Sequence, residues 1–351
     1  MTRTQRLTAI CAVAATALAG ACKDSISPSA ADPSAMATAV TSLNSTFSQN
    51  AVFQSLMAIS GNAVLAAPAV LPQLAPRVPG KSGAAERDLM LRLAARAPAA
   101  ILALFPANVL GKTFQWDTAS GGHYRITDST LAGAPSAGVR FRLYQVDTAT
   151  DEPRLPLTTT GYVDLTDVSN AASNGLHLVL KVGSQTAADY TVTEVKTTSS
   201  MSLTALGYVQ DVVTSGPQVT FNLSHLLTFA DSGLTTNYQA SGNGATVSLL
   251  TTYVGTSGNE SETFDWVLQK NGSVEVTGLA TADSTNIQFE INGTAFATVR
   301  EVTGSPETLT GPNGRALTAG EMQALLTIIV AFAEVYSNLS LVFVPTLLFF
   351  V

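Results

Sequence analysis

Histidines and acidic residues carry much of the chemistry that proteins perform, and their spacing is the first feature of this sequence to weigh. The three histidines, His123, His177 and His225, lie far apart, and none has a second histidine or a cysteine at metal-ligand spacing. His177 and His225 fall in stretches of alternating polar and apolar residues. A single histidine there is more often a surface or partly buried polar residue than a ligand. The histidines therefore predict neither a metal site nor a catalytic pair.

Two acidic clusters have the composition of a calcium loop. Asp147, Asp151 and Glu152 form one of them, and Asp164 and Asp167 form the other. Neither cluster has the spacing of an EF-hand loop, so solvated turn carboxylates are the favoured interpretation. We expect no metal and no cofactor.

Three short motifs are similar to parts of nucleotide or hydrolase sites but lack what those sites require. Residues 110–113, LGKT, have Pro106 where a phosphate loop needs glycine, and they lead into an expected strand. Residues 241–246, SGNGAT, fit a hairpin turn better than a dinucleotide fingerprint. Ser257 lacks the G-x-S-x-G spacing of a nucleophile elbow. We therefore expect that the protein is not an enzyme.

The elements that would position any site change character along the chain. Apolar residues recur at helical spacing over residues 34–59, and a second helix is expected over residues 84–97. From residue 113 to residue 302 the period becomes two, which is typical of half-buried strands. Asn271-Gly272 and Asn292-Gly293 supply the positive φ angles of tight hairpins. We expect about ten to twelve strands, consecutive along the chain and mostly antiparallel.

The C-terminal region combines a helix signal with an apolar tail. Thr318 and Glu321 form a capping box that begins a helix over about residues 316–337. The helix is apolar on nearly all sides and must be covered. Residues 339–351 are expected to form a final strand or strand pair, broken at Pro345. The fold class expected is α+β, mainly β, with a large curved antiparallel sheet packed around this helix. Residues 34–108 would form an N-terminal helical segment, and residues 109–351 the β domain.

The N-terminus has the features of an export signal. Arg3 and Arg6 precede an apolar stretch over residues 7–18, which is too short to span a membrane as a helix. Ala19-Gly20-Ala21-Cys22 follows, and this stretch resembles the lipobox of bacterial lipoproteins. The resemblance implies cleavage before Cys22 and lipid on that cysteine. The alternative is an ordinary signal peptide with an A-x-A cleavage site at residues 19–21.

Export and lipidation would determine how the cysteines and the charge of the chain are interpreted. Cys11 would leave with the signal peptide of residues 1–21, and residues 22–33 would form a lipidated flexible tether. Only 12% of the residues are charged, and the net charge is −7. The acidic balance argues against nucleic acid and against anionic lipid headgroups as partners. The residue after Cys22 is Lys23 and not the aspartate that is associated with inner-membrane retention. The expected location is therefore the cell envelope, with the outer membrane favoured. The protein would face the periplasm or the exterior.

Two functions of different classes follow from these expectations. The first is a non-enzymatic structural or interaction role for a lipid-anchored β protein that meets an envelope partner. The second is a periplasmic carrier that holds a hydrophobic small molecule in the concave face of the sheet, an architecture that looks like the half-barrel lipoproteins. The ligand-binding residues of the second hypothesis are Leu325, Ile329, Phe332, Tyr336, Phe221, Trp266 and Phe289. A third possibility, membrane insertion of the C-terminal tail, would place Glu334 near the middle of the span.

Overall fold

A computed structural model describes residues 55, 82–96, 103–118, 123–126, 133–147, 152–213, 215–255 and 259–343 of the chain. Contacts divide these residues into two compact units. We call them the β11–β17 unit, with residues 82–90 and 225–337, and the β1–β9 unit, with residues 55, 91–224 and 338–343. Each unit is described separately below.

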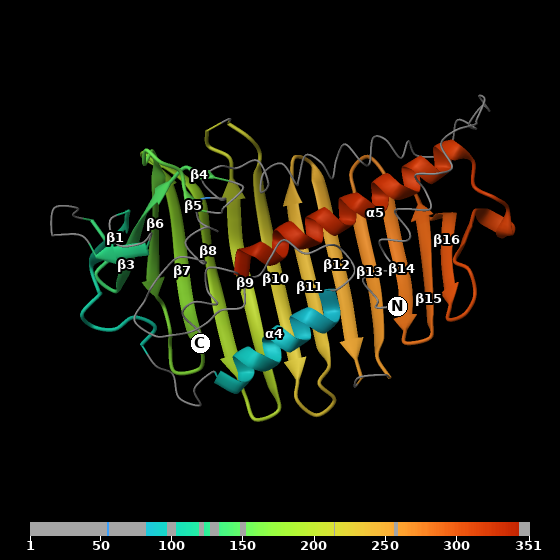
Figure 1. Ribbon diagram of the computed structural model, residues 1–351, viewed down its shortest axis with the longest axis horizontal. Helices are drawn as coiled ribbons and strands as arrows, with labels where there is room; N and C mark the ends of the chain where they lie inside the picture. The colour runs from blue at the N-terminus through green and yellow to red at the C-terminus, as the bar shows by residue number, and fades with distance from the viewer. Residues whose placement is uncertain are drawn as a thin grey trace. The chain divides into compact units, whose positions relative to one another are not determined.

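Most of the described strands belong to one large sheet, as expected for a mainly β protein. The sheet has 15 strands in the order β17-β16-β15-β14-β13-β12-β11-β10-β9-β8-β7-β6-β3-β1-β2, and β4 and β5 pair separately (Figure 1). The strand number exceeds the ten to twelve expected, because β1, β2, β4, β5 and β17 have at most six residues each and are too short to show a clear period-two pattern. Neighbours in sequence are neighbours in the sheet from β6 to β17, and the pairings described there are antiparallel. The pair β1–β3 is parallel.

The β1–β9 unit is built from strands with one buried face. In β7 the residues Leu176, Leu178 and Leu180 are fully buried, while the residues between them are partly exposed. This alternation is the period-two pattern of the sequence realised in the fold. The strands are β1 (Lys112–Asp117), β2 (His123–Ile126), β3 (Gly138–Tyr144), β4 (Val146–Asp147), β5 (Glu152–Pro153), β6 (Thr159–Asp167), β7 (Asn174–Val182), β8 (Gln185–Lys196) and β9 (Ser200–Gln210). Strand β10 (Gln218–Thr228) is divided between the units after Ser224.

The β11–β17 unit is a run of hairpins. Its strands are β11 (Leu234–Gly242), β12 (Ala245–Val254), β13 (Ser261–Gln269), β14 (Ser273–Thr281), β15 (Ser284–Ile291), β16 (Thr294–Val302) and β17 (Thr308–Thr310). Asn-Gly pairs turn β11 into β12, β13 into β14 and β15 into β16, and Asn243, Asn271 and Asn292 have φ between 51° and 54°. The hairpin turns predicted at these three places are confirmed.

The two faces of this unit differ in composition. A row that crosses six strands at one level, Tyr238, Leu249, Trp266, Val276, Phe289 and Ala297, defines the inner face. The next row, Asn237, Leu250, Asp265, Thr277, Gln288 and Thr298, defines the outer face. The inner row is apolar or aromatic, whereas Leu250 is the one apolar member of the outer row. The sheet therefore has one side for a core and one side for solvent.

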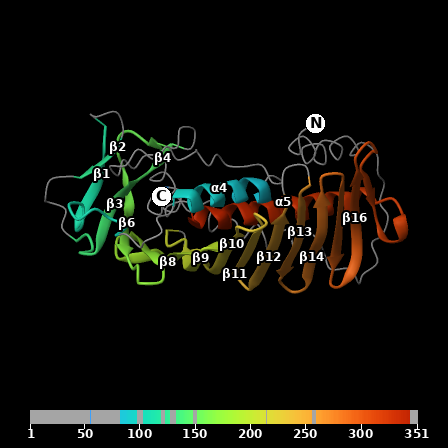
Figure 2. The ribbon, with the colours of Figure 1, turned by 90° about the horizontal axis from the view of Figure 1, so that it is seen from below.

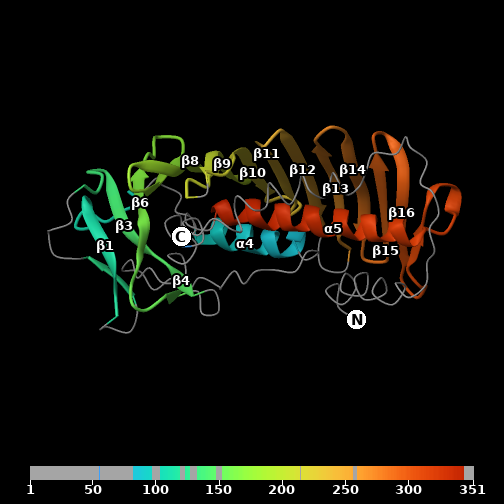
Figure 3. The same ribbon diagram turned by 90° about the horizontal axis from the view of Figure 1, so that it is seen from above.

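Helix α5 (Ala319–Ser340) covers the inner face of the β11–β17 unit, as the apolar pattern required. Residues 82–90 of α4 (Ser82–Arg96) belong to this unit. Figures 2 and 3 show this part of α4 beside α5, on the same side of the unit's strands. Leu325, Ile328, Phe332 and Tyr336 recur at helical spacing and are buried. The helices expected over residues 84–97 and 316–337 are thus confirmed, with small shifts at their ends.

The start of the predicted final strand is helical instead. Helix α5 continues to Ser340, and residues 341–343 form a further turn of 3-10 helix. The apolar residues of this stretch pack equally well on one side of a helix, so the short apolar run did not decide between helix and strand. The rest of the predicted strand, the signal peptide, Cys22, the tether, nearly all of the helix over residues 34–59, Asp151 and Ser257 lie outside the described residues.

Gly278 of β14 marks a close approach on the inner face. It lies opposite Phe264 of β13, and a Cβ atom added to it would overlap with Phe264 Cζ. The Phe264 ring therefore covers the glycine. The ring centres of Phe264 and Trp266 are 5.5 Å apart. An aromatic side chain placed over a strand glycine fills the space that the missing side chain leaves.

Candidate functional site

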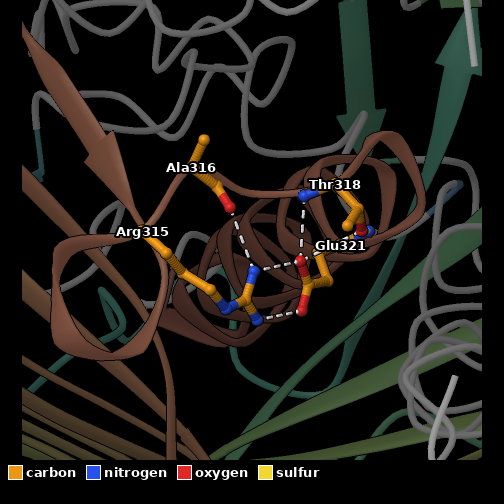
Figure 4. Close-up of polar contacts among 4 residues, drawn as sticks. All are labelled: Arg315, Ala316, Thr318 and Glu321. Carbon is orange, nitrogen blue, oxygen red and sulfur yellow. Dashed lines mark hydrogen bonds and ion pairs between the residues drawn. The ribbon is translucent and has the colours of Figure 1, made fainter.

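The start of α5 is fixed by a network of charged hydrogen bonds. Thr318 N donates to Glu321 Oε2 (2.9 Å) and Glu321 N donates to Thr318 Oγ1 (3.3 Å), which is the predicted capping box. Arg315 donates to both carboxylate oxygens of Glu321 and to the carbonyl oxygen of Ala316 (Figure 4). These bonds, led by that of Arg315, lower the pKa of Glu321 to about 2. The helix thus begins at a defined residue, which sets the register of its apolar face on the sheet.

An aromatic stack joins α5 to the inner face. The ring centres of Phe332 and Tyr336 lie 5.9 Å and 5.8 Å from that of Trp266, and Tyr336 lies 5.1 Å from Tyr238. These separations are direct ring contacts, each worth about 0.5–1.5 kcal/mol beyond the area that it buries. The structure therefore brings together three of the residues proposed from sequence to hold a ligand, and it packs them against one another.

The other proposed ligand-binding residues are spread more widely. Leu325 is buried in α5, and Phe289 is buried on the inner face, separated from Trp266 by Val276. Ile329 is only half-buried. Phe221 belongs to the β1–β9 unit, where its ring meets Tyr190 edge-on at 5.6 Å. The seven residues therefore do not line one common site within a unit.

A chain of polar side chains, all but Glu86 buried, lies beside the aromatic stack. Tyr336 Oη donates to Glu86 Oε2 of α4 (2.5 Å), and Thr236 Oγ1 donates to the same oxygen (3.4 Å). Thr236 is also 3.0 Å from His225 Nδ1, and Tyr238 Oη is 2.9 Å from His225 Nε2. His225, Tyr238 and Thr236 are at most 6% exposed. We call these five residues the Glu86 cluster.

Burial keeps the histidine and the two tyrosines of the Glu86 cluster in their neutral forms. It lowers the pKa of His225 from 6.5 to about 4, so the imidazole is neutral at pH 7. Because Thr236 donates to Glu86, its oxygen accepts from His225 Nδ1, and His225 Nε2 accepts from Tyr238. Burial, together with the Glu86 carboxylate, raises the pKa of both tyrosines. The cluster is thus a fixed hydrogen-bond chain that positions α4 and α5.

Arg87 gives α4 a second attachment to the sheet. Its guanidinium lies 4.8 Å from the ring centre of Tyr253, and its Nη1 donates to the carbonyl oxygen of Gly255 (2.9 Å). The arginine side chain is 13% exposed, so the cation–π contact is largely shielded from water. Two consecutive residues of α4 therefore hold this part of the helix on β11 and β12.

The sequence indicates that His225 is buried, although its distance from the other histidines had suggested an ordinary strand residue. His225 lies in phase with Val219, Phe221 and Leu223, the predicted buried face of β10. A histidine on such a face must find hydrogen-bond partners. Glu86 carries no comparable signal, because its partners are 150 and 250 residues away in the chain.

The other histidines and the acidic clusters that the sequence offered as candidate ligands make ordinary local contacts. His177 Nε2 lies 2.8 Å from Asp189 on a half-exposed strand surface, and His123 is exposed. Asp164 is held by Arg140 in a two-bond ion pair, and Asp167 accepts from the backbone nitrogen atoms of Leu104 and Ser169. Asp147 and Glu152 face each other across the β4–β5 pair. Within the described ranges, no three histidine, cysteine or acidic side chains gather as a metal would require.

The Asn-Gly turns border an open depression of about 630 Å³. It is lined by Gly244, Thr246, Gln269, Lys270, Asn271, Gly272, Ser273 and Asn292. Lys270 is the one charged side chain among these described residues, and the depression is shallow and open to solvent. The lining offers amides and hydroxyls, all of them at least partly exposed.

One described helix is long and apolar enough to cross a membrane by length and composition alone. It comprises α5 and the turn after it, Ala319–Phe343, with a mean hydropathy of 1.8 in its most apolar window. Half of that window is buried inside the structure. Phe332 and Tyr336, which pack on Trp266, are among its buried residues.

Comparison of the chain with models of protein families, with curated proteins and with solved structures finds no match.

Proposed function

We propose that this protein is a lipid-anchored component of the cell envelope with a structural or interaction role and no enzymatic activity. The observation that carries the proposal is the contact of α5 with the inner face. Phe332 and Tyr336 lie against Trp266 with ring centres less than 6 Å apart, so the chain itself occupies the space over this part of the sheet. A face filled in this way contributes stability rather than a ligand cavity.

The outer face of the β11–β17 unit is the surface that the proposal assigns to a partner. Its central row carries amide, hydroxyl and carboxylate groups beside the exposed Leu250. Such a mixed surface, with few charges and scattered apolar residues, resembles the composition of non-obligate protein interfaces. An envelope protein is therefore the proposed partner, because the lipid on Cys22 would hold this chain at the membrane.

A second function, the carrier of a hydrophobic small molecule, is favoured by one observation. Phe264, Trp266 and Ile287 of the inner face and Ile329 of α5 are only partly buried. Apolar side chains that remain partly exposed beside a helix could line a site for an acyl chain. The carrier hypothesis would place the ligand along α5, among these four side chains.

The lipid anchor is tested by metabolic labelling. Cells that produce the full chain are grown with radiolabelled palmitate, and Cys22→Ser is compared with Cys11→Ser. We expect label in the natural chain and in Cys11→Ser, because Cys11 leaves with the signal peptide, and no label in Cys22→Ser. Label that persists in Cys22→Ser would contradict the anchor.

Native mass spectrometry separates the two functions. Residues 24–351 are directed to a bacterial periplasm and purified without detergent. A clean polypeptide mass and a compact fold would support the interaction role, and cross-linking from the outer face would then identify the partner. A reproducible extra mass that extracts into organic solvent would support the carrier and overturn the first proposal. A chain obtained only with detergent would favour membrane insertion of α5.

A further inference from the structure

Strand β8 ends with a glutamate on its buried face. Glu194 lies in phase with Tyr190 and Val192, and it is 1% exposed. An ionised carboxylate loses its hydration there, which is costly unless a partner replaces the water. The described contacts of Glu194, which fall within the β1–β9 unit, therefore decide which charge it can carry.

Asn174 of β7 is the direct cross-strand partner of Glu194. Its Nδ2 donates to Glu194 Oε2 (3.1 Å), which satisfies one oxygen of the carboxylate. The second oxygen, Glu194 Oε1, and the amide oxygen, Asn174 Oδ1, are both buried and have no hydrogen-bond partner among the described residues. Two acceptors on facing side chains thus both lack a donor.

No described lysine or arginine forms an ion pair with Glu194, although the charge of Lys196 acts on it. Lys196 follows two residues later on β8, and its Nζ donates to the carbonyl oxygen of Ala94 in α4 (2.6 Å). The cross-strand neighbour on β9 is the apolar Leu203, and Arg92 of α4 is exposed. Burial raises the pKa of Glu194, and the Asn174 hydrogen bond and the charge of Lys196 only partly oppose it.

We propose that Glu194 and Asn174 form a proton-binding pair, in which a proton on Glu194 Oε1 is donated to Asn174 Oδ1. The proton comes from solvent, and the pair then has two reciprocal hydrogen bonds, N–H to Oε2 and O–H to Oδ1. One proton satisfies both oxygens that otherwise lack a partner, and it removes the charge from the buried face.

The pair makes this end of the β7–β8 hairpin sensitive to a rise in pH above the free value of a glutamate. The folded-state pKa of Glu194 lies above the value of 4.5 for a free side chain. Its contribution to stability is therefore complete below pH 4.5 and is lost as the pH rises through the folded-state pKa. Above that pH, an ionised Glu194 faces an amide oxygen that repels it.

The test follows the Glu194 carboxyl carbon by nuclear magnetic resonance in the mature chain labelled on glutamate. The signal is assigned by its loss in Glu194→Gln. We expect Glu194 to titrate above pH 4.5, and the natural chain to lose stability through that transition. Between the free and the folded-state pKa, each pH unit changes the unfolding equilibrium by about tenfold.

Matched variants provide an independent readout of the same pair. The amide introduced by Glu194→Gln offers an N–H to Asn174 Oδ1 in place of the shared proton. This variant should therefore keep its stability above the folded-state pKa of Glu194, where the natural chain weakens. The exposed Glu152→Gln should keep the natural pH profile. Asn174→Leu should remove the acceptor and, combined with Glu194→Gln, lower the stability of that variant as well.

Two results would overturn the proposal. One is titration of Glu194 at or below pH 4.5, which is measured on the natural chain and does not depend on the folding of any variant. The other combines two measurements. The stability at pH 8 would depend on the concentration of sodium or calcium, and the stability at a fixed cation concentration would not change with pH. That result would assign the two oxygens to a metal cation.

Discussion

The hydroxyl group of Tyr336 in α5 donates a hydrogen bond to Glu86, which precedes it by 250 residues. This bond ties α5 to α4 over the inner face, and Thr236 donates to the same carboxylate oxygen. The Glu86 cluster therefore connects two helices and two strands of the β11–β17 unit through one carboxylate.

Removing the hydroxyl of Tyr336 isolates this connection. Tyr336→Phe keeps the ring against Trp266 and Tyr238 but loses the bond to Glu86. We expect the free energy of unfolding to fall by about 1.5–3 kcal/mol, as for a hydrogen bond to a charged group. Urea unfolding measures the loss. Tyr208→Phe, which removes a hydroxyl from β9 in the other unit, is the matched control; an equal loss in both variants would contradict the role of Glu86.

His225 predicts an acid sensitivity of opposite sign to that of Glu194. Its folded-state pKa is about 4 against 6.5 for a free imidazole, so the unfolded chain binds the proton first. Stability should therefore fall as the pH drops from about 6.5 to about 4, by up to tenfold in the unfolding equilibrium per pH unit. Denaturant titrations at several pH values, with the exposed His123→Gln as the control, test this. A His225 ring signal that titrates near pH 6.5 would disprove it.

The cap of α5 is tested at Thr318. Thr318→Ala removes the acceptor for Glu321 N and the donor to the Glu321 carboxylate, and should cost about 1 kcal/mol. The folded-state pKa of Glu321, about 2, adds a pH dependence. Its contribution is present above pH 4.5 and is lost as the pH falls toward 2. Gln323→Ala, at an exposed position in the same helix, should change little; an equal effect there would indicate general helix propensity.

Gly278 and Phe264 should behave as a coupled pair. Gly278→Ala drives a methyl group into the Phe264 ring, with an expected loss of about 1–3 kcal/mol. Phe264→Leu shortens the side chain, so the double variant should lose less than the two single variants together. Gly320→Ala is the control, because a Cβ atom at Gly320 meets nothing within 4 Å. Strict additivity in the cycle would refute the contact.

Local signals in the sequence predicted much of this fold. The Asn-Gly turns, the alternation of β7 and β10, and the capping box of Thr318 and Glu321 each depend on residues close together in the chain. Each is therefore readable from sequence. The end of α5 was not, because a short apolar run packs as helix or strand depending on what it meets.

The site was less predictable than the fold for the same reason. The Glu86 cluster joins residues from four elements, and one sequence contains no information about their proximity. The period-two pattern nevertheless places His225 and Glu194 on buried faces, where a titratable side chain needs a partner. A titratable residue in a buried position therefore points to the Glu86 cluster and to the Glu194–Asn174 pair. It does not identify Glu86 or Asn174 as the partner.

The position of α5 at the end of the β11–β17 unit has a consequence for folding. Its hairpins pair neighbours in sequence, so they involve short loop closures and can form in order as the chain appears. The cover for their inner face comes last. Until α5 docks, Trp266 and Phe289 present an apolar sheet surface to other chains, and a chain interrupted before Ala319 would keep that surface permanently. Aggregation of truncated products, more than loss of strand structure, is the failure that this order of synthesis predicts.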